Sequence, residues 1–346
     1  MNYIGSKHSL LSFLENSIKE VVNSDLSSKT ICDIFAGTGA VGEHFRKLGC
    51  RVIANDLMYY SYVLNRHKIG NSKEMSFGGL DFIKSVKASE KAETVRQYLN
   101  NLEEVTGFIY NNYSPNDVGE RMYFTRENAK KCDAIRQKIG EWLKSNQITE
   151  NEYYYLLASL LKSIDKRANT ASVYGAYLKE YKKSALKPFE LELLPVHLDN
   201  NGHKVYNKDA NELVKDLECD ILYLDPPYNA RQYSSNYHVL ETIAKYDNPE
   251  LSGKSGLRIE NKKSKYCSKS AVKEEFADLI EKTKAKYIFL SYNNEGLMSL
   301  GDIKNIMQNK GQYGVLKTEY SRYKADNARE HKASSTIEFL HYVRAR

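Results

Sequence analysis

Cysteine is scarce in this sequence, and its few copies lie far apart. Five cysteines occur in 346 residues, and no two of them have the C-x-x-C spacing. An odd number at scattered positions argues against a disulfide framework and against a zinc site. We therefore expect neither a disulfide nor a bound metal, and we expect Cys32 and Cys219, in or beside apolar strands, to fill the core.

Long hydrophobic runs are missing as well. No stretch is long enough to span a bilayer, and the first residues contain neither an apolar run nor a cleavable signal. A composition of 41% hydrophobic and 27% charged residues is typical of a soluble globular protein with a sizeable core. We expect a cytoplasmic protein that has no membrane partner.

Charge of one sign does not dominate the chain. The formal net charge is +7, and a single tryptophan stands against 27 tyrosines. A mildly basic chain is compatible with a polyanionic partner, although charge alone does not identify one. The sequence has no internal repeat, and its length suffices for one large domain or two of ordinary size.

What the sequence does contain is an apolar strand that stops at two prolines. Residues 221–224 favour a parallel strand buried on both faces, and the Pro-Pro pair ends its hydrogen-bonding ladder. Open α/β sheets bind ligands at the carboxyl ends of their strands. Asp225 and the Pro226 carbonyl offer two acceptors there and Tyr228 a flat face, which suit a planar heterocycle bearing an amino group. We refer to residues 225–228 as the proline corner; a simple strand-ending turn is the alternative interpretation.

A glycine-rich turn lies between a strand and a helix near the start of the chain. Residues 30–35 predict the strand, and Gly37 and Gly39 permit a tight turn that approaches a ligand closely. The next strand ends at Asp56, whose carboxylate is placed to accept both hydroxyls of a ribose. Because the turn has the spacing G-x-G-x-x-G, a dinucleotide cofactor is an alternative here, whereas Asp33 and the proline corner favour S-adenosylmethionine.

Two residues at element boundaries have two interpretations each. Lys7, at a loop-to-helix junction, is either a ligand for a carboxylate or a solvated lysine. Asp209 precedes a short helix and is either a ligand contact or an N-terminal cap. Near the end of the chain, residues 315–323 and 335–343 predict a closing hairpin.

The middle of the sequence is long, polar and helix-like. Basic residues recur in it, among them Arg126, Lys130, Arg136 and Arg167. Cations with tyrosines between them suit a nucleic-acid face, and the alternative is a solvated helical surface. We expect a catalytic domain formed by residues 1–79 and 192–346, with a helical insert over residues 80–191.

Four motifs in this order resemble the adenine-specific DNA methyltransferases of the Dam-like class that carry D-P-P-Y. Residues 2–7 resemble the N-terminal cofactor motif of the family, residues 33–39 its glycine-rich motif, and residues 55–56 its ribose motif. Asp225-Pro226-Pro227-Tyr228 is its catalytic motif without a departure. The resemblance implies an α/β fold: a Rossmann-like S-adenosylmethionine-dependent methyltransferase sheet with an inserted, mainly helical target-recognition domain.

The resemblance also implies roles for individual residues. Asp225 and the Pro226 carbonyl would accept hydrogen bonds from the amine of an adenine turned out of the duplex, and Tyr228 would stack on the base. The amine would attack the sulfonium methyl group in line, so neither a metal nor a covalent intermediate is needed. The implied cofactor contacts are Tyr3 and Lys7 for the methionine part, Asp33, Phe35, Gly37 and Gly39 for the pocket, Asp56 for the ribose and Asp209 for the adenine amino group.

We therefore expect a site-specific N6-adenine methyltransferase acting on double-stranded DNA, with a cognate restriction endonuclease as its partner. Arg231 and Tyr233, in the loop after the proline corner, are expected near the flipped base or the gap it leaves. The alternatives are a methyltransferase acting on RNA adenine or on the cytosine amine of DNA, a non-catalytic nucleic-acid-binding protein, and a nicotinamide dehydrogenase. The sequence does not identify the DNA site, because base contacts depend on three-dimensional placement.

Overall fold

The computed structural model describes residues 7–260, 263–321 and 335–346. Tyr3, expected to contact the cofactor, lies outside these residues. The chain divides into two compact units, each with its own internal packing. Of the described residues, the sheet unit contains 7–65, 200–233, 263–321 and 335–346, and the helical unit contains 66–199 and 234–260.

The helical unit differs in its bounds from the insert expected over residues 80–191. It begins at Arg66, and it also includes Ser234–Asn261, which follow the proline corner in the sequence. The reason is packing: α10 (His238–Lys245) packs against α7 (Glu150–Asp165), so a segment late in the chain joins the core of the earlier helices.

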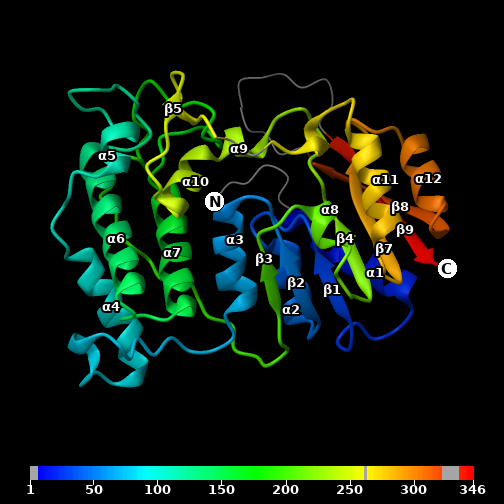
Figure 1. Cartoon of the computed structure of the whole chain (residues 1–346), viewed down its shortest axis with the longest axis horizontal. Coiled ribbons are helices and arrows are strands. Elements are labelled where there is room, and N and C mark those ends of the chain that lie inside the picture. The colour runs from blue at the N-terminus through cyan, green and yellow to red at the C-terminus, as the bar shows by residue number, and fades with distance from the viewer. Residues whose placement is uncertain (1–6, 261–262, 322–334) are drawn as a thin grey trace. The chain divides into compact units, whose positions relative to one another are not determined.

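One seven-stranded sheet forms the centre of the sheet unit, in the order β3-β2-β1-β4-β7-β9-β8 (Figure 1). The first five strands in this order are parallel, and β9 runs antiparallel to both β7 and β8. The strand order reverses between β1 and β4, which is the switch point where doubly wound sheets bind ligands. The expected Rossmann-like α/β sheet is confirmed. The strands are β1 (Thr30–Asp33), β2 (Arg51–Asn55), β3 (Lys204–Tyr206), β4 (Ile221–Leu224), β7 (Tyr287–Asn293), β8 (Gly311–Ser321) and β9 (Ser335–Ala345).

Helices connect and cover these strands. The strand-turn-helix expected at the start of the chain is β1 followed by α2, and α2 packs against β1 and β2. The longer helices of this unit are α1 (Leu11–Val22), α2 (Ala40–Lys47), α3 (Tyr59–Asn65), α11 (Val272–Lys282) and α12 (Leu300–Gln308). The short elements are η1 (His8–Leu10), α8 (Ala210–Leu213) and η5 (Lys265–Cys267), and α9 (Tyr233–Asn236) crosses the boundary of the two units.

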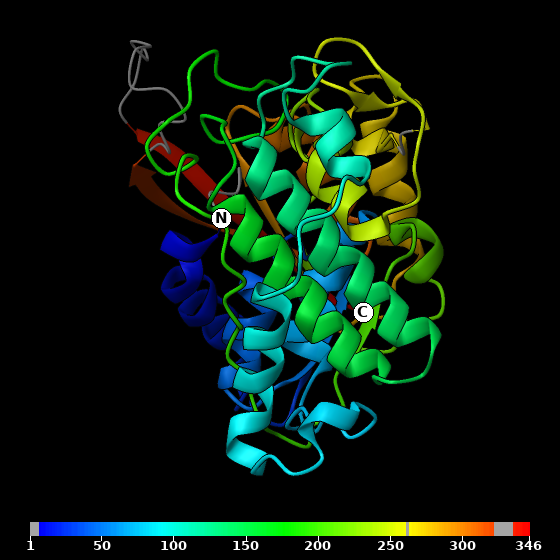
Figure 2. The ribbon, with the colours of Figure 1, turned by 90° about the vertical axis from the view of Figure 1, so that its left-hand side faces the viewer.

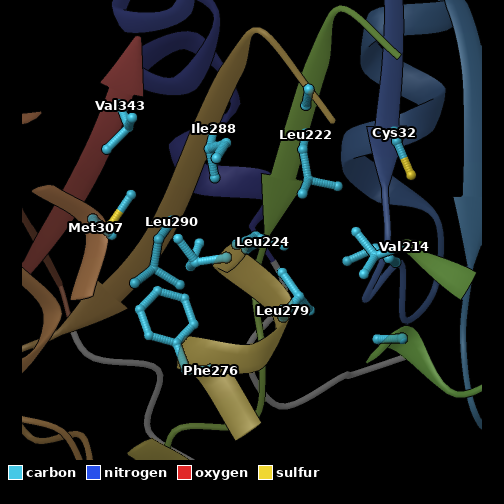
Figure 3. Packing of buried hydrophobic residues seen from close by; sticks show 14 of the residues in the cluster. Cys32, Val214, Leu222, Leu224, Phe276, Leu279, Ile288, Leu290, Met307 and Val343 are labelled. Atoms are coloured by element: carbon cyan, nitrogen blue, oxygen red, sulfur yellow. The ribbon is translucent and has the colours of Figure 1, made fainter. Parts of the chain in front are cut away.

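The core on one face of the sheet is built from alternate strand residues (Figure 3). Successive side chains of a strand point to opposite faces, so Leu222 and Leu224 share a face on β4 as Ile288 and Leu290 do on β7. Phe276 and the other apolar residues of α11 recur at helical spacing and close this layer. Cys32 lies in the same cluster with no exposed surface, and Cys219 packs against it, as expected of core-filling thiols.

Helices α6 (Arg126–Lys144) and α7 lie side by side in the helical unit (Figure 2). Helix α7 begins with a capping box in which Thr149 and Glu152 satisfy each other's backbone N–H groups. None of the helices within the described ranges is long and apolar enough to cross a membrane. The other elements of this unit are η2 (Arg66–Gly70), η3 (Asp81–Ile83), η4 (Ala88–Glu90), α4 (Lys91–Asn100), α5 (Phe108–Tyr113), β5 (Leu251–Ser252) and β6 (Leu257–Arg258).

Arg136 does not belong to a cationic surface. Its side chain is 5% exposed, and its guanidinium donates to the carbonyl oxygens of Ile243 at 2.8 Å and Ala244 at 2.9 Å. These are carbonyls of the last turn of α10, which have no partner within the helix. The basic residue that the sequence placed with the surface cations therefore binds the end of a neighbouring helix.

Shortening a core side chain tests this packing. We expect Leu290→Ala to lower the free energy of unfolding of the sheet unit by about 2–5 kcal/mol, because Leu290 has no exposed surface and the cavity cannot fully collapse. The matched control is Val315→Ala on β8, where the side chain is 46% exposed and the loss is expected to be small. Urea denaturation followed by circular dichroism measures both, and equal losses would contradict the packing described.

Candidate active site

The carboxyl ends of β1 and β4 lie next to each other at the switch point of the sheet. Their parallel register pairs Asp33, the last residue of β1, with Tyr223 of β4. The glycine-rich turn follows β1 directly, and Asp225 comes two residues after Tyr223. The two motifs, which are far apart in the sequence, therefore meet at one edge of the sheet.

Polar contacts hold the glycine-rich turn in shape. Gly37 and Gly39 have φ angles of 51° and 76°, a left-handed conformation that glycine adopts without a Cβ clash. The N–H of Gly37 donates to Asp56 Oδ2 at 2.8 Å, and its carbonyl accepts from Asn65 Nδ2 at 3.0 Å. Asp56 Oδ1 accepts from the N–H of Met58 at 2.8 Å. The acidic residue directly after β2 thus fixes the turn after β1.

Asp33 places a buried carboxyl group beneath this turn. It is 2% exposed, and the described residues offer no hydrogen-bond partner to its Oδ1. Burial, with smaller contributions from Asp225 and Asp56, raises its pKa well above the ordinary value. A buried acceptor loses its hydrogen bonds to water, and no described residue replaces them at Asp33 Oδ1. Such an acceptor is typical of a group that binds a ligand.

Lys7 is buried and ion-paired. Its ammonium lies 2.9 Å from Asp225 Oδ1 and 3.1 Å from Glu338 Oε1, and its side chain is 5% exposed. Burial alone would lower the pKa of Lys7, but the two carboxylates outweigh it and the pKa is raised well above its ordinary value. The interpretation of Lys7 as a solvated lysine is wrong.

Asp225 combines partial burial with this ion pair. Its side chain is 17% exposed, so part of the carboxylate remains accessible. Burial raises the pKa of Asp225 to about 6; Lys7 acts in the opposite direction, and the negative charge of Glu338 adds to the rise. The group therefore changes charge close to neutral pH.

Tyr228 lies beside this pair. The Lys7 ammonium is 5.8 Å from the centroid of its ring, and the ring of Tyr292 approaches it edge-on at 6.3 Å between centroids. Its carbonyl accepts from the N–H of Leu297 at 3.1 Å, which fixes the backbone after the two prolines. The aromatic ring that the sequence placed at the proline corner is thus half-buried and held from two sides.

Glu338 is the residue of this site that the sequence did not reveal. It lies on β9, is 1% exposed, and accepts a hydrogen bond from Ser291 Oγ at 2.5 Å in addition to the Lys7 ion pair. Its neighbours Ile337 and Phe339 give it the appearance of an outward-facing position on a hairpin strand. An acidic residue among apolar ones was the one sequence feature that pointed to Glu338, and it was not enough to identify Glu338 as a residue of the site.

Phe35 and Asp209 lie at the periphery of these groups. Phe35 packs edge-on against Tyr266 with ring centroids 5.0 Å apart, and it is half-buried. Asp209 is exposed, and its Oδ1 accepts from the N–H groups of Asn211 at 2.9 Å and Glu212 at 3.3 Å. Asp209 therefore serves as the N-terminal cap of α8, the structural role that the sequence allowed; its contact with a cofactor stays a prediction.

The residues expected to bind DNA occupy both units. Arg231 is exposed and Tyr233 half-buried in the loop after the proline corner. In the helical unit, Arg126 donates to the carbonyl of Pro115 at 2.8 Å and Arg167 to that of Pro188 at 3.0 Å. Lys130 lies 5.0 Å from the ring centroid of Tyr110. Each arginine bond uses one N–H group of a guanidinium that carries five.

Comparison with known proteins gives a consistent result across the chain. Residues 3–306 match the D12 class N6 adenine-specific DNA methyltransferase family. The chain is 52% identical to the type II methyltransferase M.NlaIII of Neisseria lactamica, over 99% of both proteins. It is 42% identical to the type II methyltransferase M.FokI of Planomicrobium okeanokoites, covering 99% of this chain and 52% of that protein, and 36% identical to M.CviAII of Paramecium bursaria Chlorella virus 1 over 94% and 93%.

The family match extends from the N-terminal motif past the proline corner and so includes both motifs that meet at the switch point. Together with the identity to a relative of the same length, it excludes the nicotinamide dehydrogenase suggested by the glycine spacing. The chain belongs to the D12 class N6 adenine-specific DNA methyltransferase family.

Proposed function

We propose that the protein transfers a methyl group from S-adenosylmethionine to the N6 amine of an adenine turned out of double-stranded DNA. The observation that carries the proposal is the meeting of two motifs at one sheet edge: Asp225, paired with buried Lys7, stands beside the glycine-rich turn. When bound, S-adenosylmethionine supplies an electrophilic methyl group on a positively charged sulfur.

The charge balance around Lys7 fits a cationic cofactor. Asp33, Asp225 and Glu338 are three carboxyl groups around a single ammonium, and Asp33 Oδ1 and Glu338 Oε2 have no hydrogen-bond partner among the described residues. Buried acidic groups in excess favour a positive ligand: the raised pKa of Asp33 means that its charged form is disfavoured without a compensating cation, and a bound cation would supply that compensation. This supports a sulfonium cofactor over an anionic nucleotide.

The glycine-rich turn and its neighbours would hold the rest of the cofactor. Gly37 and Gly39 leave room for close approach of a ligand to the backbone. Asp56 accepts the backbone N–H groups of Gly37 and Met58, one on each oxygen. A carboxylate oxygen can accept more than one hydrogen bond, so the same side chain would also bind ribose hydroxyls. Phe35, Lys7 and Asp209 complete the set, and for Asp209 this means a contact from its exposed second oxygen.

The proline corner would bind the adenine. Asp225 and the Pro226 carbonyl would each accept a hydrogen bond from one N–H group of the amine. These bonds draw the nitrogen lone pair out of conjugation with the ring and towards the methyl group. Tyr228 supports the face of the base. Lys7 holds Asp225 through Oδ1 and so limits the rotation of the carboxylate. The base must leave the stack first, because its amine is paired within the duplex.

Modification of one fixed sequence is the proposed biological role. The relatives named above include type II methyltransferases, and a further one, 39% identical, is the modification methylase LlaI of Lactococcus lactis. We infer that this chain is the modification enzyme of a restriction-modification system and acts in the cytoplasm. A cognate endonuclease would recognise the same DNA sequence. Mapping methylated adenines in the host genome is expected to give one recurring short sequence.

The direct test is methyl transfer from labelled S-adenosylmethionine to duplex DNA, structured RNA and a protein mixture. Label is expected in the duplex, recovered as N6-methyladenine by mass spectrometry of the digested nucleosides. Label in RNA or on the cytosine amine would overturn the substrate and keep the mechanism. Absence of transfer to all three substrates, with cofactor bound, would overturn the proposal itself.

Removing the carboxylate of the proline corner is expected to abolish transfer. Asp225→Ala takes away one of the two acceptors for the amine, and we expect the single-turnover rate to fall at least about 100-fold, as when a preorganised hydrogen-bonding group is deleted elsewhere. Cofactor affinity, measured by calorimetry, is expected to fall much less than the rate, because Asp225 is only one of the acidic groups around Lys7. Asp25→Ala, at an exposed aspartate before β1, is the matched control. Loss of the folded state in Asp225→Ala would remove the support that this variant gives.

The surface of α6 gives a prediction about DNA affinity. Arg126 and Lys130 are four residues apart and share one face of the helix. If both contact phosphates, the double variant Arg126→Ala/Lys130→Ala lowers the slope of log K against log salt by about 2, equally for cognate and unrelated duplexes. Arg51→Ala, at the amino end of β2, is the control. An unchanged slope would show that neither residue contacts the backbone.

A further inference from the structure

The last strand of the sheet contributes a buried carboxylate to the site. Glu338 on β9 pairs in register with Asn293 of β7. Ser291 lies two positions before Asn293 on β7, so Ser291, Asn293 and Glu338 point to the same face of the sheet. The same alternation places Tyr223 and Asp33 on that face, since Tyr223 pairs with Phe289 and with Asp33. Glu338, Ser291, Tyr223 and Asp33 therefore lie on the same face of the sheet, on four adjacent strands.

Glu338 contacts two side chains: Ser291, which holds the carboxylate in place, and Lys7, whose ammonium the carboxylate holds. Ser291 Oγ donates to Glu338 Oε1 at 2.5 Å, and both side chains are buried. The same oxygen is 3.1 Å from the Lys7 ammonium, whose other partner is Asp225 at 2.9 Å. The chain of contacts runs from Ser291 through Glu338 and Lys7 to Asp225. Within it Glu338 is linked to the carboxylate at the proline corner through Lys7, and its charge also acts on that carboxylate directly.

We propose that Glu338 is a positioning residue for methyl transfer: with Ser291 it anchors the Lys7 ammonium against Asp225 Oδ1 and sets the charge balance in which Asp225 works. The inference rests on the function proposed for Asp225. It gives a purpose to an acidic residue buried in the sheet, where an unpaired carboxylate would be costly.

Two physical consequences follow from this arrangement. A lysine side chain has many rotamers, and two carboxylates bound to its ammonium restrict those rotamers more than a single ion pair does. The negative charge of Glu338 also opposes ionisation of Asp225. The titratable groups that face Asp225 in the described part of the chain are Lys7, Glu338, Asp33, Tyr223 and Tyr228.

The pH dependence of the reaction separates this role from a purely structural one. The pKa of Asp225 is raised to about 6, so in the wild type kcat/KM is expected to fall as the pH drops below about 6, where a protonated carboxyl accepts the amine less well. Glu338→Gln keeps the shape and an acceptor for Ser291 but removes the charge. Because the charge of Glu338 raises the pKa of Asp225, the acid limb should move to lower pH, while kcat at neutral pH falls about tenfold through the weaker hold on Lys7.

Three further variants sharpen the test. Ser291→Ala removes the hydrogen bond and keeps the charge, so its acid limb is expected to stay near that of the wild type. Glu319→Gln makes the same chemical change at an exposed position of β8 and should alter neither quantity. Glu338→Asp retains the charge but withdraws it from Lys7 by one methylene, and kcat should fall. It keeps the proposal testable if Glu338→Gln does not fold.

An acid limb that stays in place in Glu338→Gln, or unchanged kcat in both Glu338 variants, would overturn the proposal. Titration of Asp225 by NMR with 13C-labelled aspartate, its signal assigned by its loss in Asp225→Ala, does not depend on turnover. A lower pKa of Asp225 in Glu338→Gln supports the inference even if transfer to DNA fails, and an unchanged one contradicts it even if transfer succeeds. Failure of the proposed function and failure of the positioning role are thus distinguishable.

Discussion

The parallel pairing of β1 with β4 is the constraint on which the rest of the site depends. It brings the glycine-rich turn and the proline corner to the same edge of the sheet, although almost two hundred residues separate them in the sequence. Neither motif could act alone, because one is suited to a nucleoside and the other to a planar amine. Their juxtaposition follows from the reversal of strand order at this point, which leaves the two carboxyl ends as direct neighbours.

The chemistry of the site is governed by charge that the sheet keeps away from water. Lys7 is the one ammonium paired with both Asp225 and Glu338 in the described part of the chain, and Asp33 lies close enough to add to their field. Such a group of charges is costly to bury, so its presence in the sheet indicates a functional use. Glu338 extends that group of charges from the proline corner to β9. Residues on or next to strands from β1 to β9 thus contribute to the electrostatic surroundings of Asp225.

Local pattern predicted the elements well, and distant pairing explains what it did not predict. Residues 221–224 form β4 as the apolar run before two prolines indicated, and α6 and α7 lie in the middle of the chain, which was expected to be helical. Lys7 could not be recognised as buried, since both of its partners lie far along the chain. Glu338 was hidden by the alternation of its own strand, because which face of β9 is buried depends on its register with β7. The helical unit took up Ser234–Asn261 through helix packing that no local signal carries.

Asp56 joins two parts of the site in a way that affects how the cofactor is received. Its carboxylate accepts the N–H groups of Gly37 and Met58, so the glycine-rich turn is ordered by a hydrogen bond made during folding. A loop that is ordered in advance does not lose its conformational freedom when a ligand arrives, and binding energy is not consumed in arranging it. In the proposed function the same side chain binds the ribose, which would couple the entropy of forming the turn to the recognition of the sugar through one residue. Under that proposal, the affinity for the nucleoside part of the cofactor would depend on the rigidity of the turn as well as on the strength of the contact.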